Sequence, residues 1–238
     1  MAENRSIFTF KKFQLAHGDP GLKISTEACL FGAIASNFAK GNILDIGTGS
    51  GLLACMMAQK CPESNITGIE INTEVAQLAQ ENFNKFPLST KLTVINIDLN
   101  DFQSKELFDF IVCNPPFFSN HLANQNQSKH IAIHSDLLDP NDLSNAISQL
   151  LNTHGQALVL YPALNMQIFE KSLFHKNLYI NQLIEIYPNP SLPLLRQIAL
   201  ISHSKTDKKT SKLTIKNASN EYSDEFKNLL QSYYLIFP

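Results

Sequence analysis

Short β-rich runs alternate with helical stretches from residue 42 onward, and this alternation constrains the fold more than any other feature of the sequence. The β-rich runs comprise residues 43–46, 66–71, 92–97, 108–113 and 156–161. Helical stretches separate most of them, and short buried strands that alternate with helices form parallel sheets through right-handed crossovers. The pattern therefore predicts an α/β fold, in which a mostly parallel sheet carries helices on both faces.

The first 40 residues lie outside this alternation. Residues 6–16 alternate aromatic or apolar with polar side chains and predict a short extended hairpin. Ser25-Thr26-Glu27 supplies capping residues for a helix over 28–39. We expect residues 1–40 to form an N-terminal extension that packs on one domain of residues 41–238. The later part of that domain is predicted to contain a helix to residue 174, strands over 178–187, 197–203 and 213–216, and a last helix within 223–235.

Composition and cysteine spacing exclude several classes of protein. The 238 residues include 19 basic and 21 acidic side chains, so the chain is not a globally basic protein that coats nucleic acid, although a local basic face is compatible with this balance. Without any C-x-x-C pair, the cysteines are interpreted as reduced core thiols; they are Cys29, Cys55, Cys61 and Cys113. No apolar run reaches the roughly 18 residues of a membrane span, and no signal peptide is evident. We expect a soluble cytoplasmic protein that binds neither membrane nor metal.

A proline-rich corner follows the run at 108–113. In Asn114-Pro115-Pro116-Phe117 the prolines fix their own φ angles and lack backbone donors, and Asn114 is pushed toward an extended conformation because it precedes a proline. The corner can hold an amide oxygen and backbone carbonyls at the end of a strand, where open α/β sheets place their ligands. These groups accept hydrogen bonds from a planar amino group, and Phe117 offers a flat face for its ring. The alternative is a simple proline-terminated strand followed by two core aromatics, Phe117 and Phe118.

A glycine-rich loop joins the first β-rich run to the helix that follows it. The segment 45–54 contains Gly47, Gly49 and Gly51, which let the backbone approach a ligand closely. The helix N-terminus presents unpaired amides at the same place. The loop therefore predicts a nucleotide-type cofactor, and a glycine-rich turn without a ligand is the alternative.

Two cofactors are compatible with the spacing of this loop. Gly49, Gly51 and Ala54 satisfy the dinucleotide pattern, with Glu70 about twenty residues later as a ribose ligand. Asp45 argues against a dinucleotide, because a carboxylate two residues before the first glycine would repel a pyrophosphate. The same carboxylate would attract the cationic amino-acid moiety of S-adenosylmethionine. The loop therefore favours S-adenosylmethionine.

Acidic side chains end two further β-rich runs. Glu70 lies at the end of the run at 66–71, where its carboxylate could bind both ribose hydroxyls. Asp98 follows the run at 92–97, where it could read the amino group of an adenine. Each acid alone is also compatible with an ordinary solvated loop. Three acids at successive strand ends beside a glycine loop favour a cofactor site.

This set of motifs resembles the class I S-adenosylmethionine-dependent methyltransferases that methylate an amino nitrogen. The set consists of the glycine loop 45–51, Glu70, Asp98 and the corner 114–117. The resemblance implies a Rossmann-like sheet, mostly parallel with an antiparallel strand near one edge. Adenine-N6, cytosine-N4, guanine-N2 and glutamine-N5 methyltransferases share the Asn-Pro-Pro-aromatic corner, so the corner indicates the reaction and leaves the substrate open.

The two ends of the chain resemble one family more closely. The blocks 8–17, 22–33, 213–216, 222–223 and 233–235 are similar to the bacterial valine-tRNA adenine-N6 methyltransferases, which modify the purine next to the anticodon. The resemblance implies methylation of N6 of adenine 37 in a valine tRNA. It implies S-adenosylmethionine as the cofactor and a tRNA anticodon stem-loop as the partner. We also expect a monomer.

The resemblance further implies roles for individual residues. Asn114 and Pro115 are expected to accept the two N–H bonds of the target amino group, with Pro116 completing the corner and Phe117 stacking on a base turned out of the stem-loop. The expected cofactor-binding residues are Lys23, Thr26, Asp45, Gly47, Thr48, Gly49, Gly51, Glu70, Ile71, Asp98, Leu99 and Asn114. RNA needs a cationic surface. The lysines expected to supply it are Lys11, Lys12, Lys205, Lys208, Lys209 and Lys212.

Some features depart from the family or leave alternatives open. Members usually have Gly-Thr-Asp where this chain has Ser25-Thr26-Glu27, often Tyr at the position of Phe117, and often Arg at that of Ile133. The polar segment 119–135 is too long for an ordinary turn, which predicts a mobile lid or an insertion near the ligand. The alternative functions are a glutamine-N5 or rRNA guanine-N2 methyltransferase, a nicotinamide-dependent oxidoreductase, and a non-catalytic RNA-binding protein.

Overall fold

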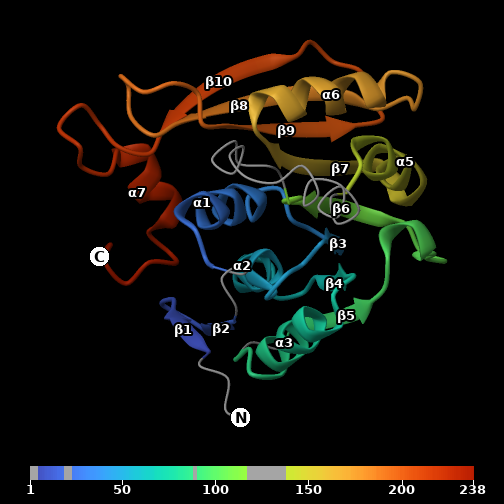
Figure 1. Cartoon of the computed structure of the whole chain (residues 1–238), viewed down its shortest axis with the longest axis horizontal. Coiled ribbons are helices and arrows are strands. Elements are labelled where there is room, and N and C mark those ends of the chain that lie inside the picture. Colours follow the sequence, from blue (N-terminus) through green and yellow to red (C-terminus); the bar gives the residue numbers. More distant parts are fainter. Residues whose placement is uncertain (1–4, 19–22, 88–89, 117–137) are drawn as a thin grey trace, which may run out of the picture.

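A sheet of eight strands forms the centre of the described part of the protein, which comprises residues 5–18, 23–87, 90–116 and 138–238 of the computed structural model. Its strands are β3 (Asn42–Ile46), β4 (Asn65–Glu70), β5 (Lys91–Asn96), β6 (Phe108–Cys113), β7 (Leu151–Tyr161), β8 (Tyr179–Tyr187), β9 (Arg196–Ser202) and β10 (Lys209–Thr214). A separate hairpin consists of β1 (Ser6–Thr9) and β2 (Gln14–His17). Across the sheet the order is β10-β8-β9-β7-β6-β3-β4-β5, from the top to the bottom of Figure 1.

The sheet is mostly parallel. β7, β6, β3, β4 and β5 pair with one another in parallel, and β10 pairs with β8 in the same way. β9 is antiparallel to both of its neighbours, β7 and β8. The predicted parallel sheet with an antiparallel strand near one edge is confirmed. Because the central strands are parallel, their carboxyl ends all lie along one edge of the sheet.

Helices cover both faces of this sheet. They are α1 (Thr26–Ala35), α2 (Leu52–Lys60), α3 (Thr73–Asn84), α5 (Pro140–Leu150), α6 (Ala163–Leu173) and α7 (Asp224–Leu230), with a short 3-10 turn, η2 (Leu99–Asp101). One face packs against α1, α2 and α7, and the other packs against α5 and α6. None of the described helices is both long enough and apolar enough to cross a bilayer.

Side chains of the central strands point alternately to the two faces, because a strand has a side-chain period of two. In β3, Ile43 packs on the face that carries α1 and α2, whereas Leu44 and Ile46 pack on the face that carries α5 and α6. In β6, Phe110 and Ile111 divide in the same way. Burying each of these side chains stabilises the fold by roughly 1.5–3 kcal/mol. A sheet covered on both faces explains why the sequence shows continuous apolar runs.

The N-terminal segment forms the predicted hairpin and helix. Ser25 caps α1 by accepting a hydrogen bond from the Ala28 amide, with a distance of 3.1 Å from N to Oγ. In the hairpin, the rings of Phe8 and Phe10 have centroids 6.1 and 6.3 Å from that of Tyr234, in the C-terminal segment. Phe10 and α1 belong to the same buried cluster as α2 and β3. The segment therefore shares its core with the sheet.

Several predicted boundaries were wrong. α1 ends at Ala35 instead of near residue 39, and α7 is shorter than the segment 223–235. β10 begins at Lys209, four residues before the predicted strand over 213–216. Its sequence has little strand propensity of its own, but pairing with β8, which places Lys209 opposite Gln182, overrides that preference.

Gly51 is constrained by both its backbone conformation and its packing. It caps α2 with a φ of +85°, and a Cβ at this position would lie 2.4 Å from Cε1 of Phe83. Gly47 also has a positive φ, of +68°, but a Cβ there would meet no described atom within 4 Å. Gly51 is therefore required by both backbone conformation and packing, and Gly47 by backbone conformation alone.

We expect Gly51→Ala to lower the free energy of unfolding by about 2–5 kcal/mol, because left-handed strain and displacement of the Phe83 ring add. The control Gly47→Ala should cost only the strain, about 1–2 kcal/mol. Urea unfolding without cofactor, followed by circular dichroism, measures both losses. Equal losses would show that the Phe83 ring does not restrict residue 51.

Candidate active site

The carboxyl ends of β6, β3, β4 and β5 border a cavity of about 930 Å³. The residues predicted from the sequence that line it are Lys23, Gly47, Thr48, Gly49, Glu70, Ile71, Asp98, Leu99, Asn114, Pro115 and Pro116. Open parallel sheets bind ligands at this edge. The structure thus brings the glycine loop, the two acids and the proline corner together around one space.

The glycine loop folds back onto the end of β4. The amides of Gly47 and Thr48 both donate to the carbonyl of Ile69, at N to O distances of 2.9 and 3.0 Å. Gly47 and Gly49 have positive φ angles, and no described atom lies within 4 Å of the place where a Cβ would stand at either position. A ligand can therefore approach the loop backbone directly.

Asp45 lies in β3, behind the glycine loop, and does not line the cavity. Its side chain is fully buried, and Thr48 Oγ1 donates to its Oδ2 at 2.7 Å. Gly68 makes room for this contact, because a Cβ there would lie 2.8 Å from the Thr48 side chain. Burial raises the pKa of Asp45 from its ordinary value of 3.8 to about 7. Asp45 can therefore act on a cofactor through its charge and through Thr48, without an exposed carboxylate.

Glu70 is held in one orientation at the end of β4. Its Oε2 accepts a hydrogen bond from the Gly49 amide and its Oε1 accepts one from the Asn72 amide, each with an N to O distance of 3.0 Å. Asn72 is also the N-cap of α3. Sequence reasoning identified Glu70 but missed Asn72, although the Asn-Thr-Glu sequence at 72–74 is a helix-start signal.

Asp98 caps the η2 turn after β5. Its Oδ1 accepts a hydrogen bond from the Asn100 amide at 2.8 Å. The Asn100 side chain donates in turn to Asp142 at 3.4 Å, which links the turn to α5. Asn100, Asp139 and Asp142 also line the cavity. They were missed because no local sequence signal predicts that the start of α5 lies beside η2.

The corner after β6 contributes a buried acceptor that has no partner within the described ranges. The Oδ1 atom of Asn114 is buried and accepts no hydrogen bond from any described residue. Pro115 is buried and Pro116 is exposed. An unsatisfied buried acceptor costs about 1–3 kcal/mol. Because Asn114 lines the cavity, this oxygen can be satisfied by a donor on a ligand.

Some predicted residues lie away from the cavity or outside the described residues. Thr26 is exposed at the start of α1, and Gly51 is buried at the start of α2; neither lines the cavity. Phe117, Ile133 and the predicted loop at 119–135 lie outside the described residues. The roles predicted for these residues stay predictions.

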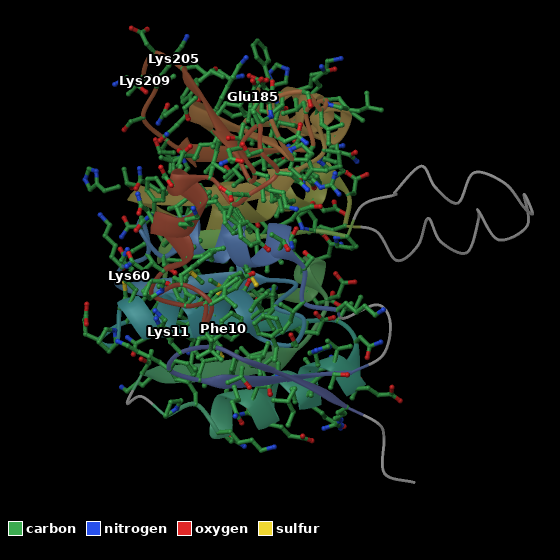
Figure 2. All side chains as sticks on the ribbon, turned by 90° about the vertical axis from the view of Figure 1, so that its left-hand side faces the viewer. Phe10, Lys11, Lys60, Glu185, Lys205 and Lys209 are labelled. Atoms are coloured by element: carbon green, nitrogen blue, oxygen red, sulfur yellow. The ribbon has the colours of Figure 1, made fainter. Side chains whose placement is uncertain are left out.

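The lysines predicted to bind RNA do not form one continuous surface. Figure 2 shows Lys205 and Lys209 at the upper end of the molecule and Lys11 in its lower half, and Lys12 follows Lys11 in the hairpin turn. Because β9 runs antiparallel, the loop from β9 to β10 that carries Lys205 lies at the sheet edge opposite the cavity. Lys212 lies further along β10, toward the edge that holds the cavity.

The groups around the cavity fit S-adenosylmethionine. Glu70 and Asp98 offer carboxylates to hydroxyl and amino donors, and the open space beside Gly47 and Gly49 admits a ligand to the loop backbone. A pyrophosphate in the same place would face Glu70 and Asp98, whereas Asp45, which the sequence argument used against a pyrophosphate, lies behind the cavity wall. Within the described ranges, no group of three or more His, Cys, Asp or Glu side chains is placed to hold a metal ion.

Comparison with known proteins identifies the family. The family model described as "Methyltransferase small domain" matches residues 22–141. The tRNA1(Val) (adenine(37)-N6)-methyltransferase of Shewanella baltica is 33% identical over 237 residues, covering 97% of this chain and 99% of the relative. Proteins of the same name from Vibrio parahaemolyticus and Bacteroides fragilis are each 32% identical, covering 96% and 98% of this chain and 95% and 99% of the relatives.

Solved structures share the fold at low sequence identity. A protein described as a predicted O-methyltransferase from Agrobacterium tumefaciens matches with a TM-score of 0.66 and 15% identity, covering 86% of this chain and 95% of that chain. The tRNA (uracil-54, C5)-methyltransferase of Pyrococcus abyssi, in complex with S-adenosyl-L-homocysteine, matches with a TM-score of 0.57 and 13% identity, covering 84% and 45%. These likenesses show the methyltransferase fold. The nearly full-length sequence similarity shows that this chain belongs to the family of the tRNA1(Val) (adenine(37)-N6)-methyltransferases.

Proposed function

We propose that this protein transfers a methyl group from S-adenosylmethionine to N6 of adenine 37 in a valine tRNA. Membership of the family supports the reaction and the tRNA substrate. The single structural observation that carries the proposal is the buried Oδ1 of Asn114 in the cavity wall, which has no hydrogen-bond partner among the described residues. An exocyclic amino group is the kind of donor that this acceptor needs.

Asn114 and Pro115 are proposed to form an acceptor pair for this amino group. The Oδ1 atom of Asn114 takes one N–H bond and the carbonyl of Pro115 takes the other, while Pro116 fixes the backbone of the corner. Two such bonds orient N6, and correct orientation of reacting groups can be worth about 7–11 kcal/mol. Phe117, outside the described residues, is proposed to stack on the adenine ring.

Catalysis then rests on positioning and electrostatics. Bound S-adenosylmethionine supplies an electrophilic methyl group on a sulfonium. The acceptors at Asn114 and Pro115 hold N6 with its lone pair directed away from them, and they stabilise the positive charge that develops on this nitrogen. The new C–N bond replaces the bond from the methyl group to sulfur, which leaves a neutral thioether. The N6 proton becomes acidic only as the C–N bond forms and passes to solvent, so the corner needs no dedicated general base.

The carboxylates proposed to bind the cofactor are already oriented by hydrogen bonds within the protein. Glu70 is fixed by the amides of Gly49 and Asn72, so its carboxylate is oriented before ribose hydroxyls arrive. Asp98 is fixed on the η2 turn and is proposed to bind the adenine amino group of the cofactor. The described part of one chain supplies both the cavity and the first part of the corner, and we propose that the protein acts as a monomer.

Lys212 is proposed as a phosphate contact for the anticodon stem-loop. It is exposed on the cavity side of β10, with Nζ 5.5 Å from the centroid of the Tyr187 ring. Lys205, at the opposite edge, makes a similar contact with Tyr179, at 5.9 Å. Lys208 pairs with Glu170 on α6, at an Nζ to Oε1 distance of 2.8 Å. Lys212 therefore differs from Lys205 by its position toward the cavity, and from Lys208 because Lys208 is paired with a carboxylate.

Asn114→Ala should lower the kcat of tRNA methylation by about 10²–10³-fold, as expected for the loss of one hydrogen-bond partner of the transition state. Its affinity for S-adenosylmethionine, measured by isothermal titration calorimetry, should fall much less than kcat, because the other expected cofactor-binding residues are unchanged. The activity assay incubates total tRNA with labelled S-adenosylmethionine and identifies the modified nucleoside, which should be N6-methyladenosine.

The control for this variant is Asn152→Ala, because Asn152 is a half-buried asparagine near the start of β7, at the other end of the sheet. This control should methylate tRNA at nearly the wild-type rate. If the Asn114→Ala protein binds cofactor and methylates tRNA at the wild-type rate, the proposed acceptor pair of Asn114 and Pro115 is wrong. Label in protein, or in N2-methylguanosine, would overturn the proposed substrate.

Asp45→Asn should make the cofactor-free protein more stable, and by more at pH 8 than at pH 5. In the wild type, the unfolded chain releases the Asp45 proton near pH 3.8 but the folded protein holds it up to about pH 7. The wild-type free energy of unfolding therefore falls by up to about 4 kcal/mol as the pH rises through this window. Thermal unfolding of both proteins at several pH values measures the difference. A pH-independent difference would show that Asp45 is ionised in the fold throughout.

Lys212→Gln should reduce the slope of log Kd for tRNA against log salt concentration by about 0.7–0.9, the value for one lost phosphate contact. Lys205→Gln is the matched control, because Lys205 also lies over a tyrosine ring but at the opposite edge of the sheet. Filter binding at four salt concentrations gives the slopes. An unchanged slope for Lys212→Gln assigns this lysine to the solvated surface.

A further inference from the structure

Helix α3 connects two segments that border the cofactor cavity. At its start, the Asn72 amide donates to Glu70. Near its end, the Phe83 ring packs against Gly51 of the glycine loop. Asn82, beside Phe83, contacts the same loop and also the N-terminal hairpin. The end of α3 therefore lies where the hairpin meets the cofactor loop.

Asn82 forms three hydrogen bonds through one buried side chain, which is 2% exposed. Its Nδ2 donates to the carbonyl of Ser50 at 2.8 Å and to the carbonyl of Ala16 at 2.9 Å. Its Oδ1 accepts a hydrogen bond from the Ala16 amide, also at 2.9 Å. The amide thus joins both backbone groups of one hairpin residue to one carbonyl of the glycine loop.

Packing alone does not explain an asparagine at this position. The other buried residues of α3 are Ala76, Leu78, Ala79 and Phe83, so Asn82 lies within an apolar face. Burying a side-chain amide is unfavourable unless its hydrogen bonds are satisfied, and an apolar residue would avoid that penalty. What Asn82 adds is a directional link between two backbone segments.

Asn82 acts on the cavity through Ser50. Ser50 lines the cavity, whereas Asn82 does not. Holding the Ser50 carbonyl limits the orientations of the loop, which includes the cavity-lining residues Thr48 and Gly49. Lys23 and Ile24, which line the same cavity, follow the hairpin in the sequence. Through its contacts with Ser50 and Ala16, one buried side chain therefore joins a cavity-lining loop to the hairpin.

We propose that Asn82 is a positioning residue that couples docking of the N-terminal hairpin to cofactor binding. This inference rests on the proposed function, because it takes the cavity as the S-adenosylmethionine site. The coupling is reciprocal: a hairpin held by Asn82 strengthens cofactor binding, and bound cofactor stabilises the docked hairpin to the same extent.

The first test compares two asparagine variants. Asn82→Ala should weaken the affinity for S-adenosylhomocysteine about tenfold, the effect of losing loop-orienting hydrogen bonds. Its kcat at saturating S-adenosylmethionine should stay near the wild-type value, because the corner residues are unchanged. Isothermal titration calorimetry gives the Kd, and the tRNA methylation assay gives the split between KM and kcat.

The matched control is Asn181→Ala. Asn181 also forms three side-chain hydrogen bonds, with Ser202, Ser204 and Thr206, at 2.7, 3.1 and 3.4 Å, but at the sheet edge opposite the cavity. This control should lower the melting temperature and leave the Kd unchanged. Equal Kd values for wild type, Asn82→Ala and Asn181→Ala would overturn the coupling and leave Asn82 with a purely structural role.

The second test uses the wild-type protein, so its result does not depend on whether Asn82→Ala folds. S-adenosylhomocysteine should slow hydrogen exchange of the Ala16 amide, which donates to Asn82. Exchange of the Thr206 amide, which donates to Asn181, should not change. Unchanged exchange at Ala16 overturns the coupling alone. A wild-type protein that does not bind S-adenosylhomocysteine overturns the proposed function as well.

Discussion

The parallel register of β6, β3, β4 and β5 is the constraint on which the whole site depends. Ile46 lies opposite both Cys113 and Ile69, and Ile69 lies opposite Ile95, so the four strands end nearly in step. At the end of each of these strands, the polypeptide therefore places polar groups at the same edge of the sheet. A slip of one residue in β6 would exchange its two faces, which would move Cys113 to the opposite face of the sheet and turn Asn114 away from the cavity.

The site keeps polar groups that the fold alone does not satisfy. Asn114 holds an acceptor without a described partner, and Asp45 holds a carboxyl group in a fully buried position. Both features lower the stability of the empty protein. Both also become favourable when an amino donor or a cationic cofactor group arrives. These two polar groups therefore lower the stability of the ligand-free protein, but they are already in place when a ligand binds.

Local patterns predicted the parts of the structure that depend on local chemistry. The strand runs, the glycine loop, Glu70 and the corner could be read from the sequence because each is set by a few neighbouring residues. The position of Lys205 could not, because it follows from β9 running antiparallel between β7 and β8. Asp142 and Asn82 were missed for the same reason: their roles depend on contacts with η2, the hairpin and the glycine loop, which are distant in the sequence.

The lysines of β10 have a possible structural role that does not involve RNA. β10 is an edge strand, and its residues from Lys209 to Lys212 are exposed. An open edge presents unpaired backbone groups that could pair with a strand of another molecule, and charged side chains, lysine above all, discourage that pairing. The same residues that suggest a nucleic-acid surface in the sequence thus also protect the sheet from growing by strand addition.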